Sequence, residues 1–377
     1  MQASFPGVVI SGSGLFRPAD VITNDELVTA FNAYADRQNA LHADAIAAGT
    51  HQALTHSSVE FIEKASGIRQ RFVLEKSGVL DPARMYPRFE PRGDDQLSLM
   101  AEIAVDAARQ ALADAGVSGE QVDAVICASA NMQRAYPAMA IEIQQALGAR
   151  GFGFDMNVAC SSATFAIEQA TNALRCGTAR CVVVVNPEIT SAHLEWRDRD
   201  CHFIFGDVCT ALVLQRSDEV PSGRGFEVLG TQLVTQFSNN IRNNFGFMNR
   251  AEDRDPKDRD LTFYQEGRKV FKEVVPMAAA HIEAHLAALS LAPAQVRRFW
   301  LHQANQGMNQ LVIKKLVGAD AGSEVAPLIL DRYANTASAG SVIAFHEYRG
   351  DLQAGDLGVI CSFGAGYSIG SVVVRKR

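Results

Sequence analysis

Two stretches of this chain share one pattern, LADAGVSGEQVDAVICASAN at residues 112–131 and LAALSLAPAQVRRFWLHQAN at residues 286–305. Each begins with Leu-Ala, carries Gln-Val ahead of an apolar run and ends with Ala-Asn. Each pattern predicts a helix, a turn and a buried strand, because helical spacing gives way to a continuous apolar segment. A unit that occurs twice in one chain indicates a duplicated structure.

Two further matches follow in the same order. ACSSA at 159–163 resembles ANTAS at 334–338, an alignment that places Cys160 opposite Asn335. FIFGDVCTALVLQR at 203–216 resembles CSFGAGYSIGSVVVRK at 361–376. Three matches in one order indicate that a whole half of the chain is duplicated.

Strands and helices alternate within each half. The apolar runs CVVVVN (181–186) and LGVICSF (357–363) predict strands covered by helices on both faces. Apolar residues recur at helical spacing over 98–115, 163–176 and 269–289. The sequence therefore predicts an α/β fold of two similar halves packed in layers.

The division between the halves is predicted within 217–224, where Pro, Gly and Ser cluster, so that the halves comprise residues 1–220 and 221–377. Two stretches have no counterpart in the other half. Residues 29–58 are rich in Ala and predict helix, and residues 75–95 carry three prolines and predict loop. Long insertions of this kind often cover a binding site.

The composition is that of a globular protein, with 377 residues, 47% hydrophobic, 20% charged and a net charge of −7. The negative charge argues against nucleic acid as a partner. The seven cysteines are odd in number and lack CxxC spacing, which favours free thiols. There is no signal-peptide pattern or membrane-length apolar run, so we expect a cytoplasmic protein without a membrane partner.

Cys160 is the first candidate for chemistry. It precedes a predicted helix that starts at Ser161 or Ser162, where unpaired N–H groups and the helix dipole are expected to lower a thiol pKa. The same position also suits a packed cysteine with no chemical role. This segment alone does not decide between the two interpretations.

His302 and Asn335 are the other candidates. His302 follows an apolar strand, where layered α/β proteins collect ligand-binding groups, although a structural histidine is equally ordinary. Asn335 also suits a turn or cap. Together with Cys160 they would supply a nucleophile, an imidazole and an amide donor around one point. The glycine turn FGAG (363–366) could bring a backbone N–H to an oxyanion.

At these residues the chain resembles the condensing enzymes of the thiolase superfamily, most closely the β-ketoacyl-[acyl-carrier-protein] synthase III family. That fold is thiolase-like, with duplicated α/β halves in a layered αβαβα arrangement. The resemblance rests on the order of the motifs GSGLFRPADVITNDEL (12–27), SGIRQR (66–71), AYPAMAIEIQQALG (135–148), IFGD (204–207), HQAN (302–305), ANT (334–336) and the terminal FGAG.

The resemblance implies a two-stage reaction. Cys160 would take an acyl group from acyl-CoA, with the backbone N–H groups of Cys160 and Ala365 as the oxyanion hole. Malonyl-acyl-carrier-protein would then bind, and His302 and Asn335 would stabilise the enolate formed as CO2 leaves. The enolate would attack the acyl-cysteine and give a 3-oxoacyl thioester, with no metal and no cofactor.

The resemblance also implies binding residues. The family pattern places CoA or pantetheine against Phe61, Arg199, Arg268 and Asn305, the acyl group near Tyr136 and Phe363, and the carrier protein on Lys314 and Lys315. Tyr136 would come from the second subunit of a homodimer. The chain departs from the family's basic residues at Ala65 and Gly307, which puts the acyl group and its carrier in question.

Three other functions compete with condensation. An acyltransferase could pass the acyl group from the same trio to an alcohol or amine. A thiolase would place a second cysteine where Phe363 stands, although Cys361 lies two residues earlier. A silent scaffold would bind CoA without needing the trio. His42, His51 and His56 lack the spacing of a metal site.

Overall fold

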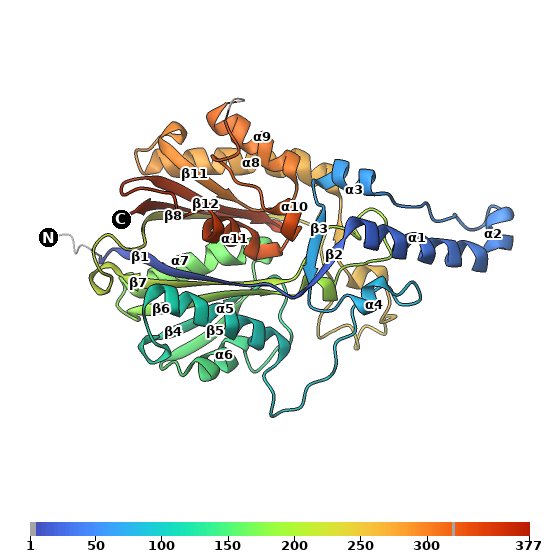
Figure 1. Cartoon of the computed structure of the whole chain (residues 1–377), viewed down its shortest axis with the longest axis horizontal. Helices are drawn as coiled ribbons and strands as arrows, with labels where there is room; N and C mark the ends of the chain where they lie inside the picture. The colour runs from blue at the N-terminus through green and yellow to red at the C-terminus, as the bar shows by residue number, and fades with distance from the viewer. Residues whose placement is uncertain (1–4, 319–320) are drawn as a thin grey trace.

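The computed structural model describes residues 5–318 and 321–377, and the hydrogen bonds within them join nine strands into one sheet (Figure 1). The strand order is β11-β12-β13-β8-β1-β7-β6-β4-β5. Two residue pairs join β1 to β8, so the sheet divides there into two halves. The strands are β1 (Val8–Phe16), β4 (Ala124–Ala128), β5 (Phe152–Met156), β6 (Cys181–Glu188), β7 (Val208–Arg216), β8 (Phe226–Ser238), β11 (Val296–Leu301), β12 (Leu357–Gly364) and β13 (Gly366–Lys376).

Helices cover and separate the two halves of the sheet. The helices α5 (Leu99–Ala115) and α6 (Met139–Leu147) pack on the outer face of the β4–β6–β7 half. The helices α8 (Gly267–Ala288) and α9 (Gln306–Val317) pack on the outer face of the β11–β12–β13 half. Between the halves lie α7 (Ser162–Arg175) and α11 (Gly340–Glu347), whose apolar side chains share one core with strands of both halves.

This arrangement has five layers, helix, strand, helix, strand and helix, and the predicted layered thiolase-like fold is confirmed. The three helices predicted from apolar spacing are α5, α7 and α8, each within a few residues of its predicted ends. The segment 217–224, predicted to divide the halves, connects β7 to β8 and holds a short 3-10 turn at Ser217–Glu219.

The first insertion is only partly helical. The helix α1 (Asn24–Leu41) starts with a capping box in which Thr23 and Glu26 exchange side-chain and backbone hydrogen bonds. The chain continues through α2 (Ala43–Ala47) and returns as an extended segment. These residues, 24–57, form an arm that projects from the body of the molecule (Figure 1). The predicted helix is therefore wrong over residues 48–57. Asn39 and Asn32 hold that extended segment through hydrogen bonds to its backbone at Leu54 and Ser57.

The second insertion is a loop, as predicted, apart from the single turn α4 (Ser77–Leu80). The remaining short elements are β2 (Asp20–Thr23), β3 (Gln70–Val73), α3 (Val59–Ser66), β9 (Ile241–Arg242), β10 (Tyr264–Gln265) and α10 (Leu330–Tyr333). Among the described residues, no helix combines the length and the apolar character that crossing a bilayer requires.

Candidate active site

Cys160 lies in the 3-10 turn Ala159–Ser161 that leads into α7, as the predicted helix start requires. The preceding residue, Ala159, has a φ of 46°, a left-handed conformation that is costly outside glycine. The turn places the thiol at a cavity of about 850 Å³. His302, Asn335 and Phe363 also line this cavity, so the structure brings the three predicted catalytic side chains together.

The backbone around the thiol packs closely against it and supplies hydrogen-bond donors. A β-carbon at Gly364 would lie 2.5 Å from Cβ and 3.0 Å from Sγ of Cys160, so only glycine fits against this cysteine. The backbone N–H groups of Ala365 and Cys160 itself favour the ionised sulfur and lower its pKa. These are the two groups that the sequence predicted as the oxyanion hole.

The expected low thiol pKa is wrong for this structure. Burial raises the pKa of the Cys160 thiol to about 12, and the nearby Glu188 carboxylate adds to the rise. Together these two effects outweigh the two N–H groups, since removing a thiolate from water costs more than these donors return. The resting form of Cys160 is therefore the neutral thiol.

His302 directly follows β11, and its backbone N–H donates to the carbonyl of Cys361 at 2.8 Å. Its side chain is 2% exposed, and the ring meets Phe363 edge to face at 5.2 Å between centroids. Burial lowers the pKa of His302 to about 4, against a smaller opposite effect from the backbone of Ala337. At neutral pH this imidazole is uncharged and acts as a hydrogen-bond donor rather than a cation.

Asn335 lies in a loop whose backbone is held on both sides. Its N–H donates to the carbonyl of Ile204 at 2.9 Å, and its own carbonyl accepts from the N–H of Gly206 at 3.1 Å. The side-chain Oδ1 accepts from the N–H of Ala337 at 2.9 Å, which fixes the amide orientation. The Nδ2 group makes no hydrogen bond within the described residues and is left for a ligand in the cavity.

The predicted pairing of Cys160 with Asn335 across the repeat is wrong by three residues. The turn Ala159–Ser161 before α7 corresponds to the turn Ala337–Ala339 before α11, so Ser338 is the counterpart of Cys160. Asn335 corresponds instead to Asn157, whose Oδ1 likewise accepts from the N–H two residues later. The short ACSSA and ANTAS match misled the alignment because small residues fill both turns.

The predicted CoA residues lie at the outer end of the same cavity. Phe61, Arg268 and Asn305 line it, and the Arg199 guanidinium stacks on the Phe61 ring at 3.8 Å from its centroid. Arg199 also donates to the carbonyl of His56 at 2.8 Å. Asn305 has a structural use as well, because its Oδ1 caps α9 and its Nδ2 donates to the carbonyl of Ala65 at 2.7 Å.

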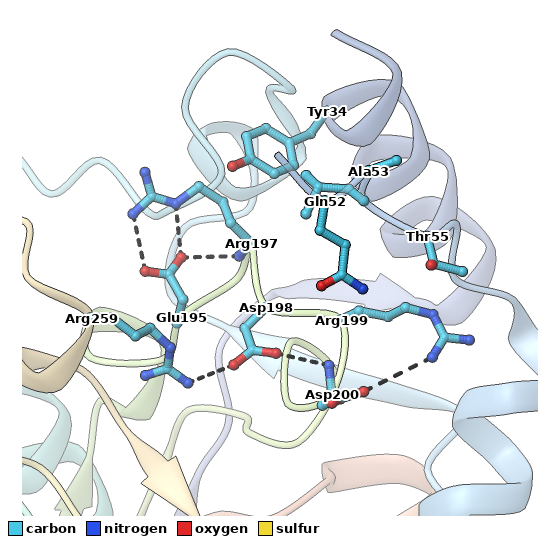
Figure 2. Close-up of a pocket in the computed structure, with 11 residues that line it drawn as sticks. Tyr34, Gln52, Ala53, Thr55, Glu195, Arg197, Asp198, Arg199, Asp200 and Arg259 are labelled. Atoms are coloured by element: carbon cyan, nitrogen blue, oxygen red, sulfur yellow. Dashed lines mark hydrogen bonds and ion pairs between the residues drawn. The ribbon is translucent and has the colours of Figure 1, made fainter. Parts of the chain in front are cut away.

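A polar pocket adjoins this end of the cavity and lies between the arm and the turn 195–200 (Figure 2). Its arginines are already matched by carboxylates: Arg197 pairs with Glu195, and Arg259 pairs with Asp198 at 2.7 Å. Arg199 extends away from these two pairs, and its guanidinium lies 3.9 Å from Asp200 (Figure 2). The arm thus lines the polar pocket, which shares Asp198, Asp200 and Arg259 with the cavity of Cys160.

Three other predicted residues lie outside the cavity. Lys314 and Lys315 are exposed on α9, and Tyr136 is 85% exposed at the tip of a loop. Cys361, the thiolase candidate, is fully buried in β12. No group of His, Cys, Asp and Glu within the described residues is suited to hold a metal, and His42 stacks on His51 instead.

Glu188, which no sequence motif singled out, is a buried carboxylate at the end of β6 and is 1% exposed. Burial raises the pKa of Glu188 to about 7, against hydrogen bonds from Ser338, Ala130 and Ser129 that lower it. The available signal was its position, since Glu188 ends an apolar strand and His302 directly follows one.

The fold and this trio define an acyl-transferring condensing enzyme of the thiolase type, and comparisons with known proteins agree. The family models for 3-oxoacyl-[acyl-carrier-protein] synthase III match residues 154–236 and, for its C-terminal part, residues 286–376. The β-ketodecanoyl-[acyl-carrier-protein] synthase of Pseudomonas aeruginosa is 57% identical over 92% of this chain and 99% of its own length. The β-ketoacyl-[acyl-carrier-protein] synthase III of Rhodospirillum centenum is 30% identical over 97% of this chain and 98% of its own.

Solved structures share the fold. The 3-oxoacyl-[acyl-carrier-protein] synthase III of Aquifex aeolicus has a TM-score of 0.76 at 24% identity, covering 98% of this chain and all of the other. The priming β-ketosynthase of the R1128 polyketide pathway has a TM-score of 0.77 at 22% identity, covering 99% and 97%. The chain belongs to the 3-oxoacyl-[acyl-carrier-protein] synthase III family, and the predicted family and enzyme class are confirmed.

Proposed function

We propose that this enzyme condenses a medium-chain acyl-CoA with malonyl-acyl-carrier-protein, with an eight-carbon primer as its preferred substrate. The observation that carries the proposal is the 57% identity, over nearly the whole length, to a synthase named for a β-ketodecanoyl product. A ten-carbon product contains two carbons from malonyl after CO2 has left, so its primer has eight.

In the first stage Cys160 attacks the thioester carbon of the acyl-CoA. A bond forms between Sγ and the acyl carbon, the bond to the CoA sulfur breaks, and the thiol proton leaves with CoA. The N–H groups of Cys160 and Ala365 face the sulfur and support the oxyanion of this step. Because the resting thiol is neutral, its proton must move as the sulfur attacks, and it ends on the CoA sulfur, which becomes basic as its bond to the acyl carbon breaks.

In the second stage malonyl-acyl-carrier-protein enters the emptied cavity. Its carbon–carbon bond to the carboxylate breaks, CO2 leaves, and the electron pair moves onto the thioester oxygen as an enolate. Neutral His302 and the free Nδ2 of Asn335 are the donors for that oxygen. The enolate carbon then attacks the acyl group, and the sulfur of Cys160 leaves and regains a proton. This sequence of steps uses no cofactor.

A second cavity, of about 1090 Å³, supports a chain longer than acetyl. Its apolar lining includes Met100, Met132 and Ile189, and the second insertion covers it with Phe89. An aromatic contact joins its lining to that of the Cys160 cavity. Phe205 lines the catalytic side and meets His193, which lines the second cavity, at 5.6 Å between ring centroids.

The carrier and the second subunit complete the proposal. Lys314 and Lys315 present exposed positive charge for an acidic carrier protein. The strand β5 lies at the sheet edge with Phe152 and Phe154 40% and 37% exposed, which supports pairing with a second copy. In such a dimer the exposed Tyr136 loop of one subunit would reach the other's acyl pocket. The seven free cysteines agree with a reducing compartment such as the cytoplasm.

Chain-length selection is the test. The protein is incubated with acyl-CoAs from acetyl to dodecanoyl, its acyl adducts are measured by intact mass, and 3-oxoacyl product is measured after malonyl-acyl-carrier-protein is added. We expect the highest kcat/KM for octanoyl-CoA. Met132→Trp should shift the preference to shorter chains, whereas Met248→Trp on the surface should not. A preference for acetyl-CoA would contradict the proposal.

The same assay tests the alternative transfer to an alcohol or amine. That function predicts an acyl adduct whose turnover needs no malonyl thioester. Product that forms only with malonyl-acyl-carrier-protein, together with release of CO2, would exclude it.

A further inference from the structure

The two turns before the central helices differ in the residue that each meets. Cys160 packs against Gly364 at the end of β12, and its counterpart Ser338 meets Glu188 at the end of β6. One half therefore brings the backbone of a glycine close against its turn, and the other half places a carboxylate against its turn. Ser338, which meets that carboxylate, lies three residues after Asn335.

Glu188 connects three segments. One carboxylate oxygen accepts from the backbone N–H of Ser338 at 3.2 Å, from the Ser338 hydroxyl and from the N–H of Ala130 at 3.0 Å. The other accepts from the Ser129 hydroxyl at 3.2 Å and again from the N–H of Ala130 at 3.3 Å. No arginine, lysine or histidine pairs with this buried carboxylate in the described part of the chain. Its charge is balanced by N–H and O–H donors.

The loop that Glu188 grips is strained. Ala334 and Ala337 have φ values of 58° and 46°, left-handed conformations that cost about 1–3 kcal/mol each outside glycine. Such a loop keeps its shape only when its surroundings hold it. Ile204 and Gly206 hold it through the backbone of Asn335, and Glu188 holds the other side through Ser338.

We propose that Glu188 and Ser338 form a positioning pair that holds the Asn335 amide toward the cavity, and thereby serve the malonyl stage rather than acylation. The inference rests on the proposed function. The carboxylate accepts from donors on both of its oxygens at once, whereas a glutamine has one acceptor oxygen and must turn its NH2 group toward one set of donors. Releasing the Ser338 side lets the strained loop relax and moves the amide.

The test compares the two half-reactions in Glu188→Gln. We expect CO2 release from malonyl-acyl-carrier-protein to fall about 10- to 100-fold, the size of effect that a misplaced group produces. Acylation of Cys160 by octanoyl-CoA should stay within about threefold of wild type or become faster, because the Glu188 charge disfavours the thiolate. A purely structural role would instead lower both half-reactions together.

Ser338→Ala provides a second variant that retains the carboxylate. It should lower CO2 release by a smaller factor, and the double variant should be no slower than Glu188→Gln alone, since both changes break one connection. Asp155→Asn is the matched control, a carboxylate near the end of β5, two strands from β6, that accepts from the N–H groups of Met139 and Ala140 at 2.7 and 2.8 Å. It should leave CO2 release unchanged.

Unchanged CO2 release in Glu188→Gln, or an equal loss in both half-reactions, would overturn the inference. If Glu188→Gln does not fold, Ser338→Ala decides by the same criteria. If wild-type protein releases no CO2 from malonyl-acyl-carrier-protein, the proposed function itself fails, and that result is seen before any variant is measured.

Discussion

The turn before α7 and the turn before α11 have the same backbone conformation but different surroundings. In both, an asparagine Oδ1 accepts from an alanine N–H two residues on, at 2.8 Å for Asn157 and 2.9 Å for Asn335. In both, that alanine has a φ of 46°. Yet one turn opens its central residue to a cavity and the other buries it completely.

The difference shows where a duplicated fold separates its functions. Gly364 and Glu188 stand at the ends of corresponding strands, and each faces the central residue of one turn. Glycine lets the end of β12 approach Cys160 more closely than any side chain would permit. Glu188 lies against Ser338 and keeps it buried. Asn335, three residues earlier, is the side chain of that loop that lines the cavity.

The largest expected effect comes from moving the thiol between the two turns. Cys160→Ala should abolish the acyl adduct, measured by intact mass after incubation with octanoyl-CoA, because the attacking sulfur is gone. Adding Ser338→Cys to that variant should not restore an adduct, since position 338 is 0% exposed and faces a carboxylate. An adduct mapped to position 338 would show that the two turns are interchangeable.

The next effect separates the two asparagines. Asn335→Asp keeps the oxygen that accepts from Ala337 and removes the amide donor, so CO2 release should fall about 10²- to 10³-fold while acylation persists. Asn157→Asp makes the same change in the other turn, where the amide donates to the carbonyl of Ala130. It should cost less than about threefold. Equal losses would mean that Asn335 has no special position.

A smaller effect is expected at Gly364, the glycine that packs against Cys160 in the turn before α7. Gly364→Ala places a methyl group against Cβ and Sγ of Cys160, which should slow acylation about tenfold and lower the free energy of unfolding by about 1–3 kcal/mol. Acylation rate and a urea titration measure the two effects. Gly246→Ala, where the added carbon has no neighbour within 4 Å, is the control. Full acylation in Gly364→Ala would show that acylation does not require the close contact between Gly364 and Cys160.

The last expected effect concerns pH. With a folded pKa of about 12, far above the ordinary value, Cys160 is mostly protonated at neutral pH and gains thiolate as pH rises. Its alkylation by iodoacetamide in the free enzyme, followed by peptide mass, should rise about tenfold per pH unit from 7 to 10 without a plateau. The thiols of the denatured chain should level off near pH 9. A plateau at neutral pH would contradict the raised pKa.

Much of the architecture could be predicted from the sequence because hydrophobic spacing is a local property. The helices α5, α7 and α8 and the strands β6 and β12 follow from patterns within each segment. The extended return at 48–57 was missed because alanine favours helix, whereas Asn32 and Asn39 hold this segment in a different conformation from across the arm. Long-range hydrogen bonds of that kind leave no local pattern.

The trio was predicted from motifs, but its chemistry needed tertiary structure. The sequence by itself determined the duplication, the layered fold and the identities of Cys160, His302 and Asn335, because these depend on residue type and order. Only the tertiary structure decided that Ser338 is the counterpart of Cys160, that the thiol rests protonated, and that Glu188 grips the Asn335 loop. Each of these depends on burial and on contacts between distant segments, for which spacing along the chain carries no information.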